Sequence, residues 1–133
     1  MAVLAMKSQI YLCRNKNTNI RLKSSSGGVF YELAAWTISQ KGVVFGAAFN
    51  KDWGVDIIKI EKIDNIEKLM GSKYTLANIN NAYQEAKKEL EKNRIVLYSG
   101  TPCQIAGLKQ FLKQDYKNLN IVSKLKIQIF IYF

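Results

Sequence analysis

The apolar positions of the first half predict one helix followed by a two-stranded hairpin. Over residues 29–40 the apolar side chains recur with helical spacing, and Lys41-Gly42 follows as the stop signal that a C-cap glycine provides. Val43–Phe49 is then a continuous apolar run, which is typical of an interior strand. A turn cluster at 50–54 separates it from Val55–Ile60, which alternates enough to be its hairpin partner.

The second half continues with alternating helices and strands. The expected elements are a short helix over 65–70 capped by Asp64 and ending at Gly71, an amphipathic helix over 78–92, a strand over 94–99, a helix over 104–113 and a strand beginning at Ile121. This order predicts an α/β or α+β fold, with a mixed β-sheet and helices packed on it.

Two terminal segments flank this pattern. Gln9–Cys13 is a short strand candidate, with Cys13 expected as a buried small hydrophobe, and a polar loop follows over 14–19. At the other end, the alternation within Ser123–Phe133 could form a strand that inserts in the sheet, although so apolar a strand at a terminus is an aggregation hazard. We therefore divide the chain into an N-terminal strand and loop (1–20), a main domain (21–122) and an atypical C-terminal segment (123–133).

Length and charge narrow the class of protein. A chain of 133 residues supports one domain with a real core. The net charge of +10 comes from seventeen lysines and three arginines against ten acids, spread over the whole length. Many of these lysines stand beside glutamates, as in 85–92, so we expect a solvated helix face and no nucleic-acid partner. An anionic cofactor or an acidic protein partner fits the charge equally well.

The absence of certain residue types excludes whole chemistries. The sequence has no histidine, which excludes histidine-dependent triads and imidazole metal sites. Its two cysteines cannot by themselves hold zinc or a four-iron cluster in the all-cysteine manner. No apolar run is long enough for a membrane span, and the start lacks the features of a signal peptide, so we expect a cytoplasmic protein.

The segment Ser99–Gln104 holds the strongest chemical signal of the chain. It follows a buried strand, contains the only proline, and places Cys103 at the start of the next helix. A helix N-terminus carries unpaired N–H groups and a partial positive charge, which favour a thiolate or an anion. The segment could hold a reactive sulfur, a cluster ligand or an anionic cofactor group, or it could be a purely structural turn.

Two further segments could bind an anion. Ser24–Gly28 stands between Arg21 and Lys23 on one side and a helix on the other, so it is either a phosphate cradle or a serine-capped helix start. It matches neither a Walker A loop nor a dinucleotide fingerprint. Gly71–Tyr74 places a cation and a hydroxylated aromatic on a loop, which can hold a flavin or a phosphate but is also common on surfaces.

Taken together in order, four segments resemble a known family. Arg21–Phe30, Gly42–Phe49, Gly71–Tyr74 and Ser99–Leu108 resemble the beta-subunit family of coenzyme F420 hydrogenases and dehydrogenases, and the resemblance covers about residues 9 to 122. It implies a flavin-dependent oxidoreductase module that binds FAD and exchanges electrons with iron–sulfur clusters. It also implies an electron-donating or ferredoxin-like partner. Whether the chain forms an oligomer is left open.

The resemblance also assigns residues. By motif, the cofactor-binding positions are Ser24, Ser25, Ser26, Gly27, Gly28, Lys73, Tyr74, Thr101, Pro102 and Gln104, and Cys103 is the candidate cluster ligand. The cysteine-rich start and the cysteine–histidine motif of the family are missing, so we do not expect an intact 4Fe-4S cluster in this chain. A truncated form of a longer redox protein fits these departures, and a non-catalytic remnant or a basic binding module is the alternative.

Overall fold

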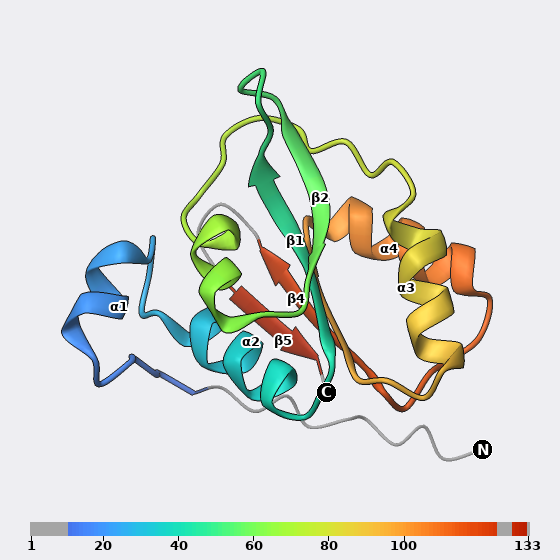
Figure 1. Ribbon diagram of the computed structural model, residues 1–133, viewed down its shortest axis with the longest axis horizontal. Coiled ribbons are helices and arrows are strands. Elements are labelled where there is room, and N and C mark those ends of the chain that lie inside the picture. The colour runs from blue at the N-terminus through green and yellow to red at the C-terminus, as the bar shows by residue number, and fades with distance from the viewer. Residues whose placement is uncertain (1–10, 125–128, 133) are drawn as a thin grey trace, which may run out of the picture.

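The computed structural model describes residues 11–124 and 129–132, and these form a mixed β-sheet with helices on both faces (Figure 1). The sheet has the strand order β2-β1-β3-β4-β5. Strands β1, β3 and β4 are parallel, and the two outer strands run antiparallel to their neighbours. The strands are β1 (Val43–Phe49), β2 (Val55–Ile60), β3 (Val96–Gly100), β4 (Leu119–Lys124) and β5 (Ile129–Tyr132). This architecture confirms the predicted α/β class.

Each face of the sheet has its own helical layer. Helix α2 and the 3-10 helix η1 pack on one face, and α3 and α4 pack on the other (Figure 1). A short helix, α1, precedes α2 in the chain. The helices are α1 (Thr18–Lys23), α2 (Val29–Ser39), η1 (Ile63–Leu69), α3 (Ala82–Glu91) and α4 (Pro102–Leu112).

The apolar run of β1 explains its central position. Alternate side chains point to opposite faces of a strand, so Val43 and Phe45 enter the core beneath α3 and α4 while Val44 and Ala48 enter the core beneath α2. All four are at most 4% exposed. A strand buried on both faces needs no polar alternation, and for this reason its sequence is apolar throughout.

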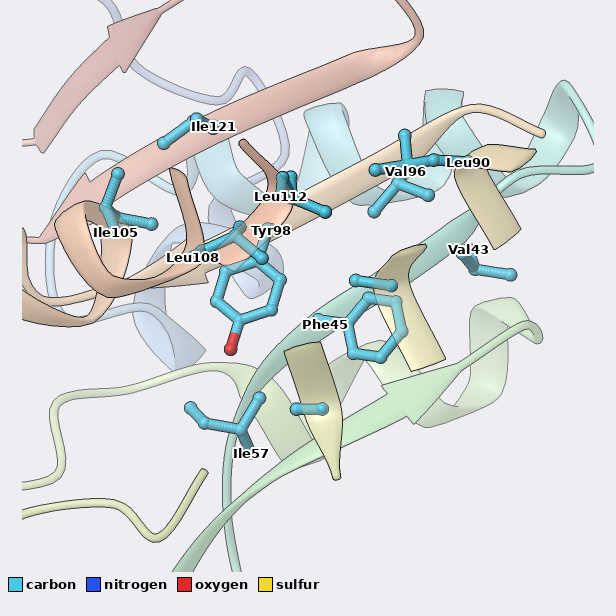
Figure 2. Close-up of a cluster of buried hydrophobic side chains, with 12 residues drawn as sticks. Val43, Phe45, Ile57, Leu90, Val96, Tyr98, Ile105, Leu108, Leu112 and Ile121 are labelled. Atoms are coloured by element: carbon cyan, nitrogen blue, oxygen red, sulfur yellow. The ribbon is translucent and has the colours of Figure 1, made fainter. Parts of the chain in front are cut away.

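The larger core lies on the α3–α4 side (Figure 2). Its centre is the stacked pair Phe45 and Tyr98, with ring centroids 5.6 Å apart and planes at 19°. Tyr98 is fully buried, and its hydroxyl points toward Ile57 in Figure 2. That hydroxyl has no hydrogen-bond partner among the described residues, which is a cost in a close-packed interior.

The structure corrects several helix-end predictions. No serine caps α2: its N-cap is Gly28, which adopts a left-handed conformation with φ of 77°. At the other end of α2 the left-handed residue is Lys41 (φ of 58°), and Gly42 donates its N–H to the Thr37 carbonyl. Gly42 is needed for space, because a Cβ there would lie 2.5 Å from the Ile95 carbonyl oxygen.

Other elements begin elsewhere than predicted. Residues 11–13 are not in a strand, Cys13 is exposed, and part of the expected polar loop forms α1 with Asn17 as its cap. The side chain of Asp64 caps nothing, since η1 begins at Ile63. Helix α3 begins at Ala82 and not at the expected residue 78, because Asn78 forms an isolated bridge with Asp56 of β2. Residues 9–10, 125–128 and 133 lie outside the described part.

The atypical C-terminal segment joins the sheet. Its residues 129–132 form β5, which pairs antiparallel with β4 and is the last strand of the sheet that the described residues form. The predicted strand is therefore confirmed for these residues, at the edge of the sheet.

Candidate functional site

The three segments predicted to bind a cofactor lie toward the edge of the sheet where β1 and β3 end. Connectivity places Ser24–Gly28 and Thr101–Gln104 there, and Gly71–Tyr74 reaches it through the contact of Lys73 with Phe49, the last residue of β1. Helix α4 follows β3 directly, so its N-terminus and Cys103 are at this edge. Helix α2 runs into β1 and packs against it, so the start of α2, with Ser24–Gly28, is at the same edge. The carboxyl ends of parallel strands are the usual place for ligands in open α/β sheets.

Asn15 determines the shape of the Ser24–Gly28 loop. Its backbone N–H donates to the Gly27 carbonyl at 2.6 Å, and its side-chain amide donates to Glu32 Oε1 at 2.6 Å and to the Gly28 carbonyl at 3.4 Å. Asn15 is 6% exposed. Two bonds from the buried side-chain amide and one from the backbone N–H hold the loop in this shape, and no sequence pattern indicated Asn15.

The cations that flank this loop are engaged elsewhere. The Arg21 guanidinium donates to the Asn15 carbonyl at 2.9 Å, and Lys23 forms an ion pair of 2.6 Å with Glu67 of η1. Both cations of the predicted phosphate cradle therefore have partners within the chain, and the cradle itself stays a prediction. What remains is the hydroxyls of Ser25 and Ser26, which are exposed, and an α2 N-terminus that no side chain caps.

Ser24 and Gly27 have structural tasks in the same loop. The Ser24 hydroxyl donates to the Ile20 carbonyl at 2.7 Å and closes α1. A Cβ on Gly27 would lie 2.7 Å from the Cys13 carbonyl oxygen, so only glycine fits this close approach.

Lys73 is the cation that the edge does present. Its ammonium donates to the Met70 carbonyl at 2.9 Å and lies over the Phe49 ring, 5.6 Å from the centroid. It forms no ion pair with a described carboxylate. Desolvation lowers the pKa of Lys73 below its ordinary 10.5. A half-buried cation without a counter-charge is suited to an anionic ligand.

The rest of this loop is open to solvent. Tyr74 is 86% exposed, and Gly71, with φ of 80°, has no atom within 4 Å of the position of a Cβ. Lys73 and Tyr74 are therefore accessible to a ligand. No side chain of the described residues covers Gly71.

Gln104 holds the Thr101–Gln104 turn in place. Its Oε1 accepts the Thr101 N–H at 3.0 Å, and its amide donates to the Ala77 carbonyl at 3.3 Å. The side chain is nearly buried, so Gln104 shapes this turn and ties it to the loop that follows η1. Pro102 begins α4, where its missing N–H costs nothing.

Cys103 is exposed beside this turn. Its sulfur lies 3.1 Å from the Thr101 hydroxyl oxygen. Nearby, the Tyr83 hydroxyl donates to the Gln104 carbonyl at 2.7 Å, and desolvation, with a smaller contribution from Cys103, raises the pKa of Tyr83. No group of three cysteine, aspartate or glutamate side chains among the described residues could hold a metal ion. This donor set does not fit an iron–sulfur cluster held within the described chain.

Side-chain contacts connect two of the three segments indirectly. The pair Lys23–Glu67 fixes α1 and the serine loop beside η1, whose end leads into Gly71–Tyr74. Lys73 then contacts the end of β1 through Phe49. The edge shared by Ser24–Gly28 and Thr101–Gln104 was predictable from the order of strands and helices, whereas the role of Phe49 was not, because its run reads as core.

Two further features lie outside these segments or concern the chain as described. A surface cavity of about 770 Å³ lies at the other end of α4 and is lined by Lys109, Lys113 and Tyr116 among others, away from these segments. In the part of the chain that the structure describes, no helix combines the length and apolar composition that crossing a bilayer requires.

The sheet order and the two helical layers define an α/β domain, and a solved structure with a similar fold is known. The chain is similar to a chain of the F420-reducing NiFe hydrogenase complex from Methanosarcina barkeri, studied after xenon derivatization. The TM-score is 0.60 at 18% identity, over 78% of this chain and 37% of that chain. At this identity the likeness shows the fold, and this chain spans little more than a third of the matched chain. No protein-family model and no curated protein matches the sequence.

Proposed function

We propose that this chain is an FAD-binding oxidoreductase module, related to the beta subunits of coenzyme F420 hydrogenases and dehydrogenases, that serves hydride or electron transfer. The observation that carries the proposal is Lys73: a desolvated ammonium, without a described acidic partner, at the edge where the parallel strands end. The shared fold with a chain of a hydrogenase complex and the order of the four sequence segments support it.

The residues of this edge fit the chemical demands of FAD. A diphosphate requires cations or N–H donors, which Lys73 and the uncapped start of α2 provide. The exposed hydroxyls of Ser25 and Ser26 can donate to phosphate or ribose oxygens. Tyr74, exposed beside Lys73, offers both a ring and a hydroxyl.

When bound, FAD supplies the redox chemistry, because the flavin ring accepts and donates hydride without a histidine from the protein. The chain would then have to bind and orient the ring and to compensate the negative charge that the ring gains on reduction. Lys73 can provide that charge, and Asn15 and Gln104 keep the two flanking loops in one conformation. Cys103 stays a candidate single ligand, and any cluster would need further ligands from a partner.

The electron donor in this proposal is a separate redox protein or a ferredoxin-like partner. The described residues offer no group of ligands for a cluster of their own, and in this proposal the partner supplies the electrons. Several lysines of the surface are already engaged in ion pairs with glutamates, which weakens the alternative of a basic nucleic-acid binder; these are Lys23, Lys59, Lys87 and Lys92.

A titration of the purified chain with FAD, followed by flavin fluorescence, tests the proposal. We expect saturable one-to-one binding and competition by ADP, which carries the same diphosphate. Circular dichroism of the same sample reports whether the protein is folded. A folded chain that does not bind FAD would overturn the proposal in favour of a folded, non-catalytic remnant.

A further inference from the structure

The turn between β1 and β2 presents an exposed tryptophan in a fixed position. Trp53 is 82% exposed and adopts φ of 61°, which is rare for a bulky residue. Asn50 holds the turn: its Oδ1 accepts the N–H groups of Asp52 and Gly54 at 3.0 and 2.8 Å, and its amide donates to Asp56 Oδ2 at 3.1 Å. The indole is therefore exposed on a well-defined turn.

The indole of Trp53 is linked to Lys73 through the Phe49 ring, which contacts both side chains. Phe49, the last residue of β1, is 55% exposed and meets Trp53 edge-on, with ring centroids 6.3 Å apart and planes at 63°. The ammonium of Lys73 lies over the Phe49 ring. We call Phe49, Trp53 and Lys73 the aromatic corner; its members come from the end of β1, the β1–β2 turn and the loop after η1.

The composition of the aromatic corner indicates the kind of ligand it can take. Indole and phenyl rings offer electron-rich surfaces that stack on flat, electron-poor ring systems. The neighbouring ammonium attracts negative charge at the rim of such a ring. A ligand that is planar, electron-poor and anionic satisfies both demands. An aliphatic ligand satisfies neither, and a cationic ligand is repelled by the ammonium of Lys73.

Resting on the proposed function, we propose that Trp53 is the stacking partner of the isoalloxazine ring of bound FAD, with Lys73 positioned by Phe49 to face the anionic part of the cofactor. Trp53 and Phe49 are then binding and positioning residues. Trp53 lies outside the four segments that carry the sequence resemblance, and Phe49 is the last residue of one of them but was not among the predicted cofactor-binding positions. The inference comes from the contact between Lys73 and Phe49 together with the exposure of Trp53.

The chain offers a matched control, because it contains one other tryptophan. Trp36 lies on α2 and is 51% exposed. We would titrate FAD into the wild type, Trp53→Ala and Trp36→Ala, and follow both flavin and tryptophan fluorescence. We expect Trp53→Ala to bind FAD about ten-fold more weakly and to restore fluorescence of the bound flavin that the indole quenches. Trp36→Ala should bind like the wild type.

Each outcome separates the two proposals. Wild-type binding that Trp53→Ala leaves unchanged, in both affinity and flavin fluorescence, overturns this inference while the proposed function stands. Absence of wild-type binding overturns both. If Trp53→Ala alters the fold by circular dichroism, Trp53→Phe replaces it: we expect an intermediate affinity and partial recovery of flavin fluorescence, and wild-type values for both would overturn the inference.

Discussion

The ammonium of Lys73 lies over the Phe49 ring, 5.6 Å from its centroid, and donates a hydrogen bond to the Met70 carbonyl. Both partners are uncharged, so the described chain supplies a place for this cation but no counter-charge. Desolvation lowers the pKa of Lys73, which means that the folded state binds this proton less readily than the unfolded chain does. The charge therefore reduces stability below pH 10.5, and that cost disappears as the pH rises through the folded and then the unfolded pKa.

Replacing Lys73 by Met should separate binding from stability. We expect FAD binding to weaken by about 1–3 kcal/mol, because an ionic hydrogen bond to the cofactor is lost. The free energy of unfolding at neutral pH should not fall, because the desolvated charge is removed. Fluorescence titration and urea unfolding measure the two quantities, with Lys68→Met, an exposed lysine of η1, as control. Equal affinity in Lys73→Met and wild type would remove Lys73 from the site.

Glu89 should stabilise the fold in a pH-dependent way. Burial alone raises its pKa, but hydrogen bonds from Arg94 (2.8 Å) and Lys59 (3.3 Å) outweigh it and hold the pKa below the ordinary 4.5. The stabilisation is therefore present above pH 4.5 and is lost as the pH falls through the lower, folded-state pKa.

We expect Glu89→Ala to lower the free energy of unfolding at pH 7 by about 2 kcal/mol, since it leaves Arg94 and Lys59 without their shared carboxylate. Urea unfolding at pH 7 and in acid measures the difference, which should narrow in acid. The exposed Glu91, which pairs with Lys87 at 3.9 Å, provides the control Glu91→Ala with a change of under 1 kcal/mol. A pH-independent loss would contradict the ionic account.

Tyr98→Phe should stabilise the protein or leave it unchanged. The Tyr98 hydroxyl is buried against the core and has no partner among the described residues, so removing it abolishes a desolvation penalty of about 1 kcal/mol without changing the ring stacking on Phe45. Thermal unfolding measures the change. A clear loss of stability would show that the hydroxyl has a partner, such as an ordered water.

Gln104→Ala should loosen the turn that carries Cys103. It removes the acceptor of the Thr101 N–H and the donor to the Ala77 carbonyl, for an expected cost of about 1–2 kcal/mol. Gln110→Ala, at an exposed position of the same helix, should cost little. Urea unfolding compares the two variants, and equal stabilities would mean that the capping contact contributes nothing.

The sequence predicted the longer elements because their apolar periodicity reflects which face is buried. The run at Val43–Phe49 and the helix over 29–40 are examples, and both formed as expected, with α2 ending at Ser39. The ends of elements were less predictable. Lys41, and not Gly42, adopts the left-handed conformation after α2. Gly42 is required for another reason, because its backbone lies too close to the Ile95 carbonyl for a Cβ atom.

The details of the candidate site depend on contacts between residues far apart in the sequence. Asn15 clamps the serine loop from thirteen positions before Gly28, and Lys23 is neutralised by Glu67 from forty-four positions away. No local pattern indicates either partner. By contrast, the alternation of strands and helices is enough to place Ser24–Gly28 and Thr101–Gln104 at one edge, because a helix that follows or precedes a parallel strand has its N-terminus there. The position of Gly71–Tyr74 depends on the contact between Lys73 and Phe49.

The most direct test of the account is to mix the purified chain with excess FAD, remove free cofactor by gel filtration, and measure the flavin absorbance that elutes with the protein. We predict about one flavin per chain for the wild type and a marked reduction for Lys73→Met, with the same far-UV circular dichroism for both. A folded wild-type protein that elutes without flavin, and shows no FAD binding in the equilibrium titration either, would contradict the account.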